Sequence, residues 1–577
     1  MKRSLVLLLL LVIVTFNFLA SCSVKEDPKV GTTESVSEST TAALPLPPVE
    51  PSGKLIVGVK EATGNFNPLY YSTPSDGDVI NLLFQGLIKR NREGVFESVI
   101  ADHWTFSEDG KSITFFLKKD IVFSDGQPLT ANDVVFTYQV LADPSYTGGF
   151  KSAVKDLVGY DAYYSGETTE FSGVEANNDY EVTFNFKEAL RINLENCALS
   201  IVPMHYYGVD FSIGNTSHIE AITTYAMGSG PYVISQFSEH SQVSLMRNTL
   251  YSGEGYHIKE INLKFYDDPE TLKLENFDLL PGIVASKKFE AAKTSGFSVN
   301  QYNKKGYKYV KTNCEWGPTA DPKVRQALYY AFDVKKFVTG YNSDIATDEL
   351  LAAPQYHPFS QASWAIDASL VNTMIDYDYN LDQAKSLLDE AGWRVDSSGF
   401  RYKDGALLEL KILAIPDDEI LAKLIEMWEK EWGQGLGIKV TVSYLELNTI
   451  LDYVIYNSNA NVEKWSLFYL ATSIASPDPD AIYTSFHSDF IGNRLDNTSR
   501  YSNPEVDALL DKGRATMSVD AAKPIYARVA KILNKEAVMM PIYANTYFDL
   551  YAPKLVDFKT FSFYNWVNAL KDARIVE

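Results

Sequence analysis

The residue types that most often carry catalysis are present in this chain, but their spacing matches no familiar catalytic arrangement. None of the seven histidines forms an HExxH pair, and no GxSxG nucleophile turn occurs. The glycines of GQGLGIK (433–439) lack phosphate-loop spacing and predict a turn between a helix and a strand. PDPD (477–480) lacks the alternating oxygen ligands of an EF-hand. A carboxylate pair that hydrolyses glycosides meets only in space, so this alternative stays open. The sequence therefore favours a protein that is not an enzyme.

A cysteine near the start of the chain is placed for a covalent modification. Cys22 ends the stretch LASC (19–22), which follows Lys2, Arg3 and an apolar run over residues 5–16. These features are typical of a secretory signal, and the run is shorter than the ~20 residues of a membrane-spanning helix. LASC resembles the lipobox of bacterial lipoproteins, which implies that Cys22 carries lipid. An uncleaved membrane anchor is the alternative.

The segment after Cys22 has the composition of a disordered tether. It is rich in Ser, Thr, Pro and Glu, with few large apolar residues before Leu44. Such a segment buries too little apolar surface to offset the entropy lost on ordering. We therefore interpret residues 1–21 as a signal peptide and residues 22–53 as the lipidated cysteine and its tether.

The remaining composition indicates a large extracytoplasmic protein. The chain has 577 residues, 46% of them hydrophobic, and a net charge of −22. This length is enough for at least two lobes, and an acidic chain lacks the basic face of nucleic-acid binders. Cys197 and Cys314 could form a disulfide in such a compartment, although two buried free thiols are the simpler interpretation. CxxC spacing is absent, so no cysteine metal site and no cofactor is indicated.

The first half of the folded part alternates strands, turns and helices. Thr130 is placed to cap the N-terminus of a helix, with Asp133 at its third position. The patterns predict strands at 54–62, 103–107 and 112–120, a helix leading into a strand over 79–91, and a helix at 131–141.

Six segments in collinear order resemble the family of extracellular solute-binding proteins, family 5, which serve dipeptide and oligopeptide ABC importers. The resemblance extends from about Lys54 to the C-terminus, and Asn276 stands where the family usually has glycine. We expect the glycines of GSGPYVI to adopt backbone angles closed to other residues. The segments are ADHWTFSEDG…YQVL (101–141), GSGPYVI (228–234), KLENFDLLPG (273–282), DPKVRQALYYAFD (321–333), YDYNLDQAKSLLDEAGW (377–393) and YSNPEVDALLDKG (501–513).

The resemblance implies an α/β fold. It is the two-lobed periplasmic-binding-protein-like fold of type II, in its large three-subdomain form, with two crossover hinges. The hinges map near residues 305–313 and 541–547. Mapped along this chain, lobe I comprises 54–86, 226–306 and a C-terminal strip at 545–577, an extra subdomain on lobe I comprises 87–225, and lobe II comprises 307–544.

The segment that binds ligand in the family's peptide binders departs from its usual pattern here. That segment resembles G-W-x-x-D-x-x-D-P-D, and its first aspartate pairs with the α-amino group of the peptide. In ATSIASPDPDAIY (471–483), the tryptophan position is Thr472 and the aspartate position is Ala475. A buried ammonium without a counter-charge is costly. Either another carboxylate replaces the aspartate, or the ligand lacks a free amine, or it is an oligosaccharide or a metal complex such as nickel.

The resemblance also suggests which residues contact the ligand. We predict Thr472, Ser473 and Ser476 on the ligand segment, and Asn67 and Tyr70 in the loop after the first strand. Two neighbouring residues, Asp478 and Asp480, are expected to stabilise a turn instead.

The function implied is that of a lipid-anchored, monomeric binding protein outside the bacterial cell membrane. It would capture a small ligand, most simply a peptide, and deliver it to the permease and ATPase subunits of an ABC importer. A ligand-sensing receptor and a tethered secreted hydrolase are the rival interpretations.

Overall fold

The computed structural model covers most of the chain after the tether. The signal peptide (1–21), Cys22 and nearly all of the tether lie outside the described residues, as does Ala475. Among the described residues, no helix has the length and apolar character needed to cross a membrane. The structure describes residues 51–267, 272–284, 288–303, 305–343, 352–474, 476–492 and 497–576.

The largest sheet of the described region is a long row of paired strands, which we call the ladder. Its order is β19-β18-β20-β13-β21-β11-β1-β10-β9-β8, and β12 and β14 also pair with β21. The bounds are β1 (Ser52–Lys60), β8 (Tyr232–Ser238), β9 (Gln242–Arg247), β10 (Ile258–Tyr266), β11 (Leu279–Val284), β12 (Ser298–Asn303), β13 (Lys308–Thr312), β14 (Ala352–Pro354), β18 (Glu409–Ala414), β19 (Lys439–Tyr444), β20 (Leu467–Ala471) and β21 (Met539–Tyr551).

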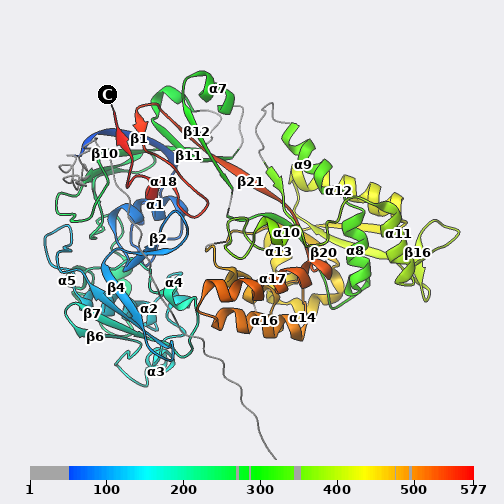
Figure 1. Ribbon diagram of the computed structural model, residues 1–577, viewed down its shortest axis with the longest axis horizontal. Coiled ribbons are helices and arrows are strands. Elements are labelled where there is room, and N and C mark those ends of the chain that lie inside the picture. Colours follow the sequence, from blue (N-terminus) through cyan, green and yellow to red (C-terminus); the bar gives the residue numbers. More distant parts are fainter. Residues whose placement is uncertain are drawn as a thin grey trace, which may run out of the picture. The chain divides into compact units, whose positions relative to one another are not determined.

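Strand β21 belongs to both halves of this ladder (Figure 1). Its first part pairs with β13 and β14, and its second part pairs with β11 and β12. Thr546 is opposite Asn303 at the end of β12, whereas Tyr543 is opposite Lys308 at the start of β13. The chain therefore passes from one half of the ladder to the other at two adjacent places, 303–308 and 543–546. Both places overlap the segments predicted as hinges.

A second sheet lies in the part of the chain before residue 225. It has the order β4-β5-β7-β6, and in β5 the side chains alternate between partly buried and buried, as expected for a sheet covered on one face. Helix α2 begins after Thr130 as predicted, and the Asp133 carboxylate accepts a hydrogen bond from the Thr130 N–H (2.8 Å). The bounds are β4 (Ala101–Phe106), β5 (Ser112–Leu117), β6 (Val174–Asn178), β7 (Glu181–Asn185) and α2 (Ala131–Ala142).

The remaining strands form three small sheets, β15-β16-β17, β2-β3 and β22-β23, and the other elements are helices. The strands are β2 (Ile88–Arg90), β3 (Phe96–Ser98), β15 (Arg394–Val395), β16 (Arg401–Lys403), β17 (Ala406–Leu407), β22 (Leu555–Val556) and β23 (Arg574–Ile575). The helices are α1 (Pro74–Leu83), α3 (Tyr160–Ser165), α4 (Asn193–Asn196), α5 (Met204–Tyr207), α6 (Ser217–Glu220), α7 (Lys288–Thr294), α8 (Pro322–Tyr330), α9 (Val334–Ser343), α10 (Ala368–Val371), α11 (Leu381–Glu390), α12 (Glu419–Trp428), α13 (Leu447–Leu451), α14 (Ser458–Asn461), α15 (Tyr483–Phe486), α16 (Pro504–Ala515), α17 (Val519–Lys535) and α18 (Trp566–Ala569).

The buried hydrophobic side chains gather into separate cores on the two sides of the crossings. We call the cluster built from residues 55–279 and 555–573 the first core. A smaller cluster joins residues 274–292 to Phe548 and Leu550 of β21. Two further clusters use residues 310–543 and 307–544, and we call the latter, which contains Ile474 and Tyr526, the third core.

Helix α8 buries the face that its sequence pattern predicts. Val324, Ala327 and Leu328 are buried at helical spacing, as predicted. Arg325 is also buried, at 2% exposure, and its guanidinium donates to the carbonyl oxygens of Thr319 (2.8 Å), Ala320 (3.0 Å) and Glu536 (2.9 Å). Because Glu536 is the C-cap residue of α17, Arg325 caps that helix.

The two glycines of GSGPY are needed for a reason that differs from the expected one. Neither Gly228 nor Gly230 has the positive φ that was predicted. Instead, both pack against the end of α1, where a Cβ on Gly230 would lie 2.4 Å from the carbonyl carbon of Leu83. The Gly230 N–H donates to the Leu83 oxygen (2.8 Å). Close approach of two backbones, and not backbone strain, therefore requires glycine here.

The two cysteines of the described region do not form a disulfide. Cys197 is buried and Cys314 is partly buried, and both are free thiols.

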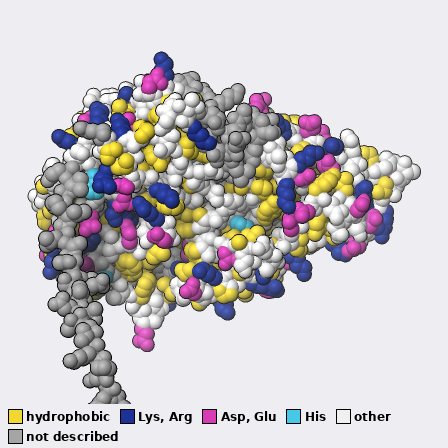
Figure 2. Space-filling model, turned by 45° about the horizontal axis from the view of Figure 1, so that its top comes forward, with side chains coloured by type: hydrophobic (Ala, Val, Ile, Leu, Met, Phe, Trp, Pro, Cys, Tyr) yellow, Lys and Arg dark blue, Asp and Glu magenta, His cyan; other side chains and the backbone are white. Residues whose placement is uncertain are grey.

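The surface carries charges of both signs. On the face shown in Figure 2, acidic and basic side chains are interspersed with hydrophobic patches. The negative charge on this face is therefore spread out.

Candidate ligand-binding site

The ligand segment predicted from the sequence leaves the end of β20 and runs beside the first crossing. The Thr472 N–H donates to the carbonyl oxygen of Tyr307 (3.0 Å). Gly306, one residue earlier in the crossing, packs directly against Thr472. The position of the segment is therefore tied to the place where the chain passes between the two halves of the ladder.

A cavity of about 320 Å³ lies beside this segment, and both Thr472 and Ser473 line it. Its wall combines aromatic and aliphatic side chains with a few hydroxyl groups. Among its described lining residues, no Asp or Glu occurs and Lys311 carries the charge. The other lining residues are Tyr307, Tyr309, Pro358, Val454, Ile455, Phe468, Leu470, Ile474, Ala481, Ile482, Ser485, Phe486, Thr498 and Met539.

The lysine in this wall is held between aromatic rings. Lys311 is 6% exposed, and its ammonium lies 5.7 Å from the ring centre of Tyr309 and 5.9 Å from that of Phe486. The faces of aromatic rings attract a cation. Such a wall suits a small ligand that combines an apolar body with hydrogen-bond acceptors.

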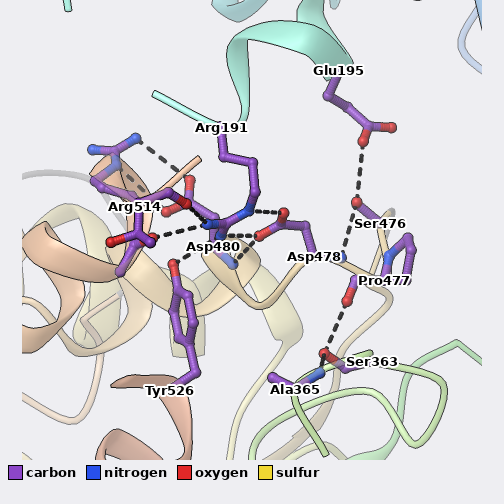
Figure 3. Close-up of polar contacts among 12 residues, drawn as sticks. Arg191, Glu195, Ser363, Ala365, Ser476, Pro477, Asp478, Asp480, Arg514 and Tyr526 are labelled. Atoms are coloured by element: carbon purple, nitrogen blue, oxygen red, sulfur yellow. Dashed lines mark hydrogen bonds and ion pairs between the residues drawn. The ribbon is translucent and has the colours of Figure 1, made fainter. Parts of the chain in front are cut away.

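Ser476 lies outside the lining of this cavity. Its hydroxyl donates to Glu195 Oε2 (3.2 Å) and accepts from the Asp478 N–H (3.1 Å) (Figure 3). It also accepts from Arg90 Nη2 (3.3 Å). Ser363 anchors the next residue by donating to the Pro477 carbonyl (2.8 Å). The described contacts of Ser476 are thus made within the protein, and its ligand role stays a prediction.

Asp478 of PDPD stabilises a turn, as the sequence predicts, whereas the turn role of Asp480 stays a prediction, and each of the two carboxylates meets an arginine. Asp478 Oδ1 accepts from the Asp480 N–H (2.9 Å) at the start of a 3-10 helix. The Asp478 carboxylate also pairs with Arg191, and Asp480 lies 3.4 Å from Arg514. Burial raises the pKa of Asp480, and the positive charge of Arg514 offsets part of that rise.

The structure places the other two predicted contacts away from the cavity. Asn67 is fully buried, and its amide donates to the carbonyl oxygens of Ile219 (2.7 Å) and Ile222 (2.9 Å). Tyr70 packs against the ring of Tyr146 at 5.0 Å, and burial raises the pKa of Tyr70 to about 12. Asn67 therefore fixes a loop, and neither residue is among those lining the cavity.

Sequence reasoning missed Arg191 and most of the cavity wall. Arg191 and Asp478 are 287 positions apart, and no local pattern relates residues at such a distance. Tyr309 and Phe486 come from a strand and a short helix whose apolar patterns indicate only burial. In the described residues, no group of three or more His, Cys, Asp or Glu is arranged to hold a metal ion.

Comparison with known proteins identifies the family. Residues 96–493 match the family described as bacterial extracellular solute-binding proteins, family 5 Middle. Oligopeptide-binding protein OppA of Lactococcus lactis is 24% identical over 75% of this chain and 74% of its own length. AppA of Bacillus subtilis, also named an oligopeptide-binding protein, is 25% identical over 89% of this chain and 88% of its own length. The nickel-binding periplasmic protein of Escherichia coli is 24% identical over 83% of this chain and 86% of its own length.

A solved structure supports the same assignment at the level of the fold. AppA of Bacillus subtilis in complex with a nonapeptide superposes with a TM-score of 0.67 and 22% identity, over 92% of this chain and all of AppA. The expected α/β, two-lobed type II binding-protein fold is thereby confirmed. The chain belongs to the bacterial extracellular solute-binding proteins of family 5.

Proposed function

We propose that this protein is the lipid-anchored binding component of an ABC importer, which captures a small ligand between two lobes and delivers it to a permease. The observation that carries the proposal is the cavity beside Thr472 and Ser473, which residues of lobe II line next to the first crossing. A site next to the chain crossings changes shape when the lobes rotate. Ligand binding can thereby favour one lobe arrangement, and a permease can distinguish it.

The proposed lobe boundaries follow the mapping made from the sequence. Lobe I comprises 54–86, 226–306 and 545–577, with 87–225 as its extra subdomain, and lobe II comprises 307–544. The separate hydrophobic cores and the pairing change along β21 support these boundaries. The first core spans both 54–86 and much of 87–225, so we expect the extra subdomain to move together with lobe I.

A peptide is the preferred ligand class, because OppA and AppA are named for oligopeptide binding. Two features argue that its α-amino group is not the main determinant of recognition. The sequence has Ala475 where the family's peptide binders have aspartate, and the described cavity wall offers Lys311 instead of a carboxylate. A nickel complex, as in the name of the Escherichia coli relative, and an oligosaccharide are the alternatives.

Two measurements test the ligand proposal. Native mass spectrometry of gently purified protein should detect a bound small molecule, since buried ligands often survive isolation. Calorimetry with di- to pentapeptides should give similar affinity for free and N-acetylated peptides. Strong binding that depends on the free amine would contradict our interpretation of Ala475.

A pair of variants connects the ligand to the cavity. Ser485→Phe fills the cavity with a bulky ring and should reduce ligand occupancy. Ser165→Phe places the same ring on an exposed position at the end of α3 and should leave occupancy unchanged. Equal occupancy in the two variants would show that the ligand binds elsewhere.

We also propose that Cys22 carries the lipid and that the protein acts as a monomer. Labelling with radioactive palmitate should mark the wild type and not Cys22→Ala, and light scattering should give the mass of one chain. A tethered hydrolase would instead convert its ligand, so we expect the bound molecule to be recovered unchanged. A sensing receptor, the other rival, would act without neighbouring permease and ATPase genes.

A further inference from the structure

Arg191 reaches from the extra subdomain into the opposite part of the protein. It lies between β7 and α4, and the neighbouring Leu194 and Cys197 pack in or against the first core. Figure 3 shows its side chain pointing away from α4 toward Asp478 and Tyr526. The described polar partners of its guanidinium all come from residues 478–526.

The central contact is a two-point ion pair that is almost entirely buried. Arg191 Nε lies 2.6 Å from Asp478 Oδ2, and Nη2 lies 2.8 Å from Oδ1. The two side chains are 9% and 7% exposed. Burial alone would disfavour the charged guanidinium, but the hydrogen bonds and the charge of Asp478 outweigh it and raise the pKa of Arg191.

The remaining donors of the guanidinium are also satisfied, and two aromatic rings lie beside it. Nη1 donates to the carbonyl oxygens of Gly513 (2.9 Å) and Thr516 (2.7 Å) at the end of α16. The rings of Trp364 and Tyr526 lie 5.0 and 5.6 Å from its central carbon. These contacts replace the water that the guanidinium loses when it is buried. An ion pair on the surface keeps its water and does not need such contacts.

A second contact beside the first one involves the same two parts of the chain. Arg90 and Glu195 form an ion pair, and both contact the hydroxyl of Ser476. The backbone takes part as well, because the Arg191 N–H donates to the Arg514 carbonyl (3.0 Å). Residues of the extra subdomain thus hold the segment Ser476–Asp478. This segment follows directly after the stretch that lines the cavity.

From this geometry we propose that Arg191 and Asp478 form a closure latch, which fixes lobe I against lobe II and thereby positions the ligand segment. The latch rests on the proposed two-lobed binding function, because it requires that the lobes separate. When the lobes separate, both charges return to water. When the lobes close, the two parallel hydrogen bonds between Arg191 and Asp478 can form in only one relative position of the lobes. Opening then moves the residues that follow Thr472 and Ser473, which couples lobe separation to ligand release.

The latch is tested on the unliganded full-length protein, so the answer does not depend on the ligand. Asp478→Asn keeps the shape of the side chain and removes its charge. In this variant the radius of gyration from X-ray scattering should increase. Hydrogen exchange of the Arg191 amide, which is bonded to the Arg514 carbonyl across the contact, should accelerate at least about tenfold. Arg191→Lys keeps the charge but loses the two-point geometry and should show a smaller change of the same sign.

The matched control is Arg528→Gln. It removes an ion pair with Glu505 at 2.9 Å between α16 and α17, where both side chains are more than half exposed, and it should change neither measurement. Unchanged scattering and exchange in Asp478→Asn would overturn the latch. Should either substitution prevent folding, the other one gives the result. If Asp478→Asn shows the expected changes but native mass spectrometry detects no ligand, the latch stands and only the proposed function is contradicted.

Discussion

Gly306 and Thr472 touch backbone to backbone, with no room for a side chain between them. A Cβ built on Gly306 would lie 1.8 Å from the carbonyl oxygen of Thr472. The next residue, Tyr307, accepts a hydrogen bond from the Thr472 N–H (3.0 Å). The first crossing and the ligand segment therefore cannot move independently, which makes Gly306 part of the candidate site although it offers no functional group.

Gly306→Ala should weaken ligand binding by about tenfold or more. The added methyl group must push the crossing away from Thr472, and a displacement of this kind in a packed region costs typically 1–3 kcal/mol. Occupancy in native mass spectrometry and calorimetric affinity measure the effect. Gly340→Ala is the control, because a Cβ there meets nothing within 4 Å and alanine favours its helix. Equal loss of binding in both variants would refute a local effect.

Asp549 on β21 predicts a pH dependence of stability. It is fully buried and accepts from the Gly282 N–H (2.7 Å) and the hydroxyls of Tyr302 (3.3 Å) and Thr560. Burial raises the pKa of Asp549 to about 6, although these hydrogen bonds oppose the rise. An unfolded aspartate has a pKa of about 3.9, so the unfolded chain releases the proton first as the pH rises.

The contribution of Asp549 is thus fully present below about pH 4 and is lost as the pH rises through about 6, by roughly 3 kcal/mol. Asp549→Asn should make this decline smaller and be more stable than the wild type at pH 8, while Asp78, whose pKa burial also raises to about 6, keeps its own share of the decline. Denaturant unfolding between pH 4 and 8 measures it. Asp161→Asn, at a side chain that is 82% exposed, should leave the curve unchanged. A decline of the same size in Asp549→Asn and in the wild type would contradict the assignment.

Arg325→Lys should destabilise lobe II by about 2–4 kcal/mol, because an ammonium cannot reach the three carbonyl oxygens that the guanidinium satisfies. Denaturant unfolding of the full chain gives the free energy. Lys323→Gln on the same helix removes an exposed ion pair with Glu390 and should cost less than about 1 kcal/mol. Similar losses in the two variants would show that Arg325 has no special role.

Counting thiols tests the lipid anchor and the cysteine assignment together. Burial raises the pKa of both Cys197 and Cys314, so the native protein should react slowly with a thiol reagent at pH 7. The chain contains three cysteines. After unfolding we expect two reactive thiols in the membrane-derived protein, because the proposed lipid would block Cys22. Three thiols would contradict lipidation, and none would indicate a disulfide.

Local signals in the sequence were sufficient wherever a short stretch decides its own conformation. Thr130 and Asp133 begin α2 as predicted, the DPKVRQ pattern buries one face of α8, and Asp478 stabilises its turn. The collinear motifs identified the family and the fold, and the glycines of GSGPY were recognised, although for the wrong reason.

The sequence determined the elements and the family, because capping, periodicity and turn chemistry act between neighbours along the chain. It also predicted the ligand segment. The tertiary structure alone decided that β21 serves both halves of the ladder, that Gly306 touches Thr472, and that Arg191 meets Asp478. These relationships join residues from distant parts of the chain. Their energy comes from packing and desolvation in the folded state, which leave no periodic trace in the order of the amino acids.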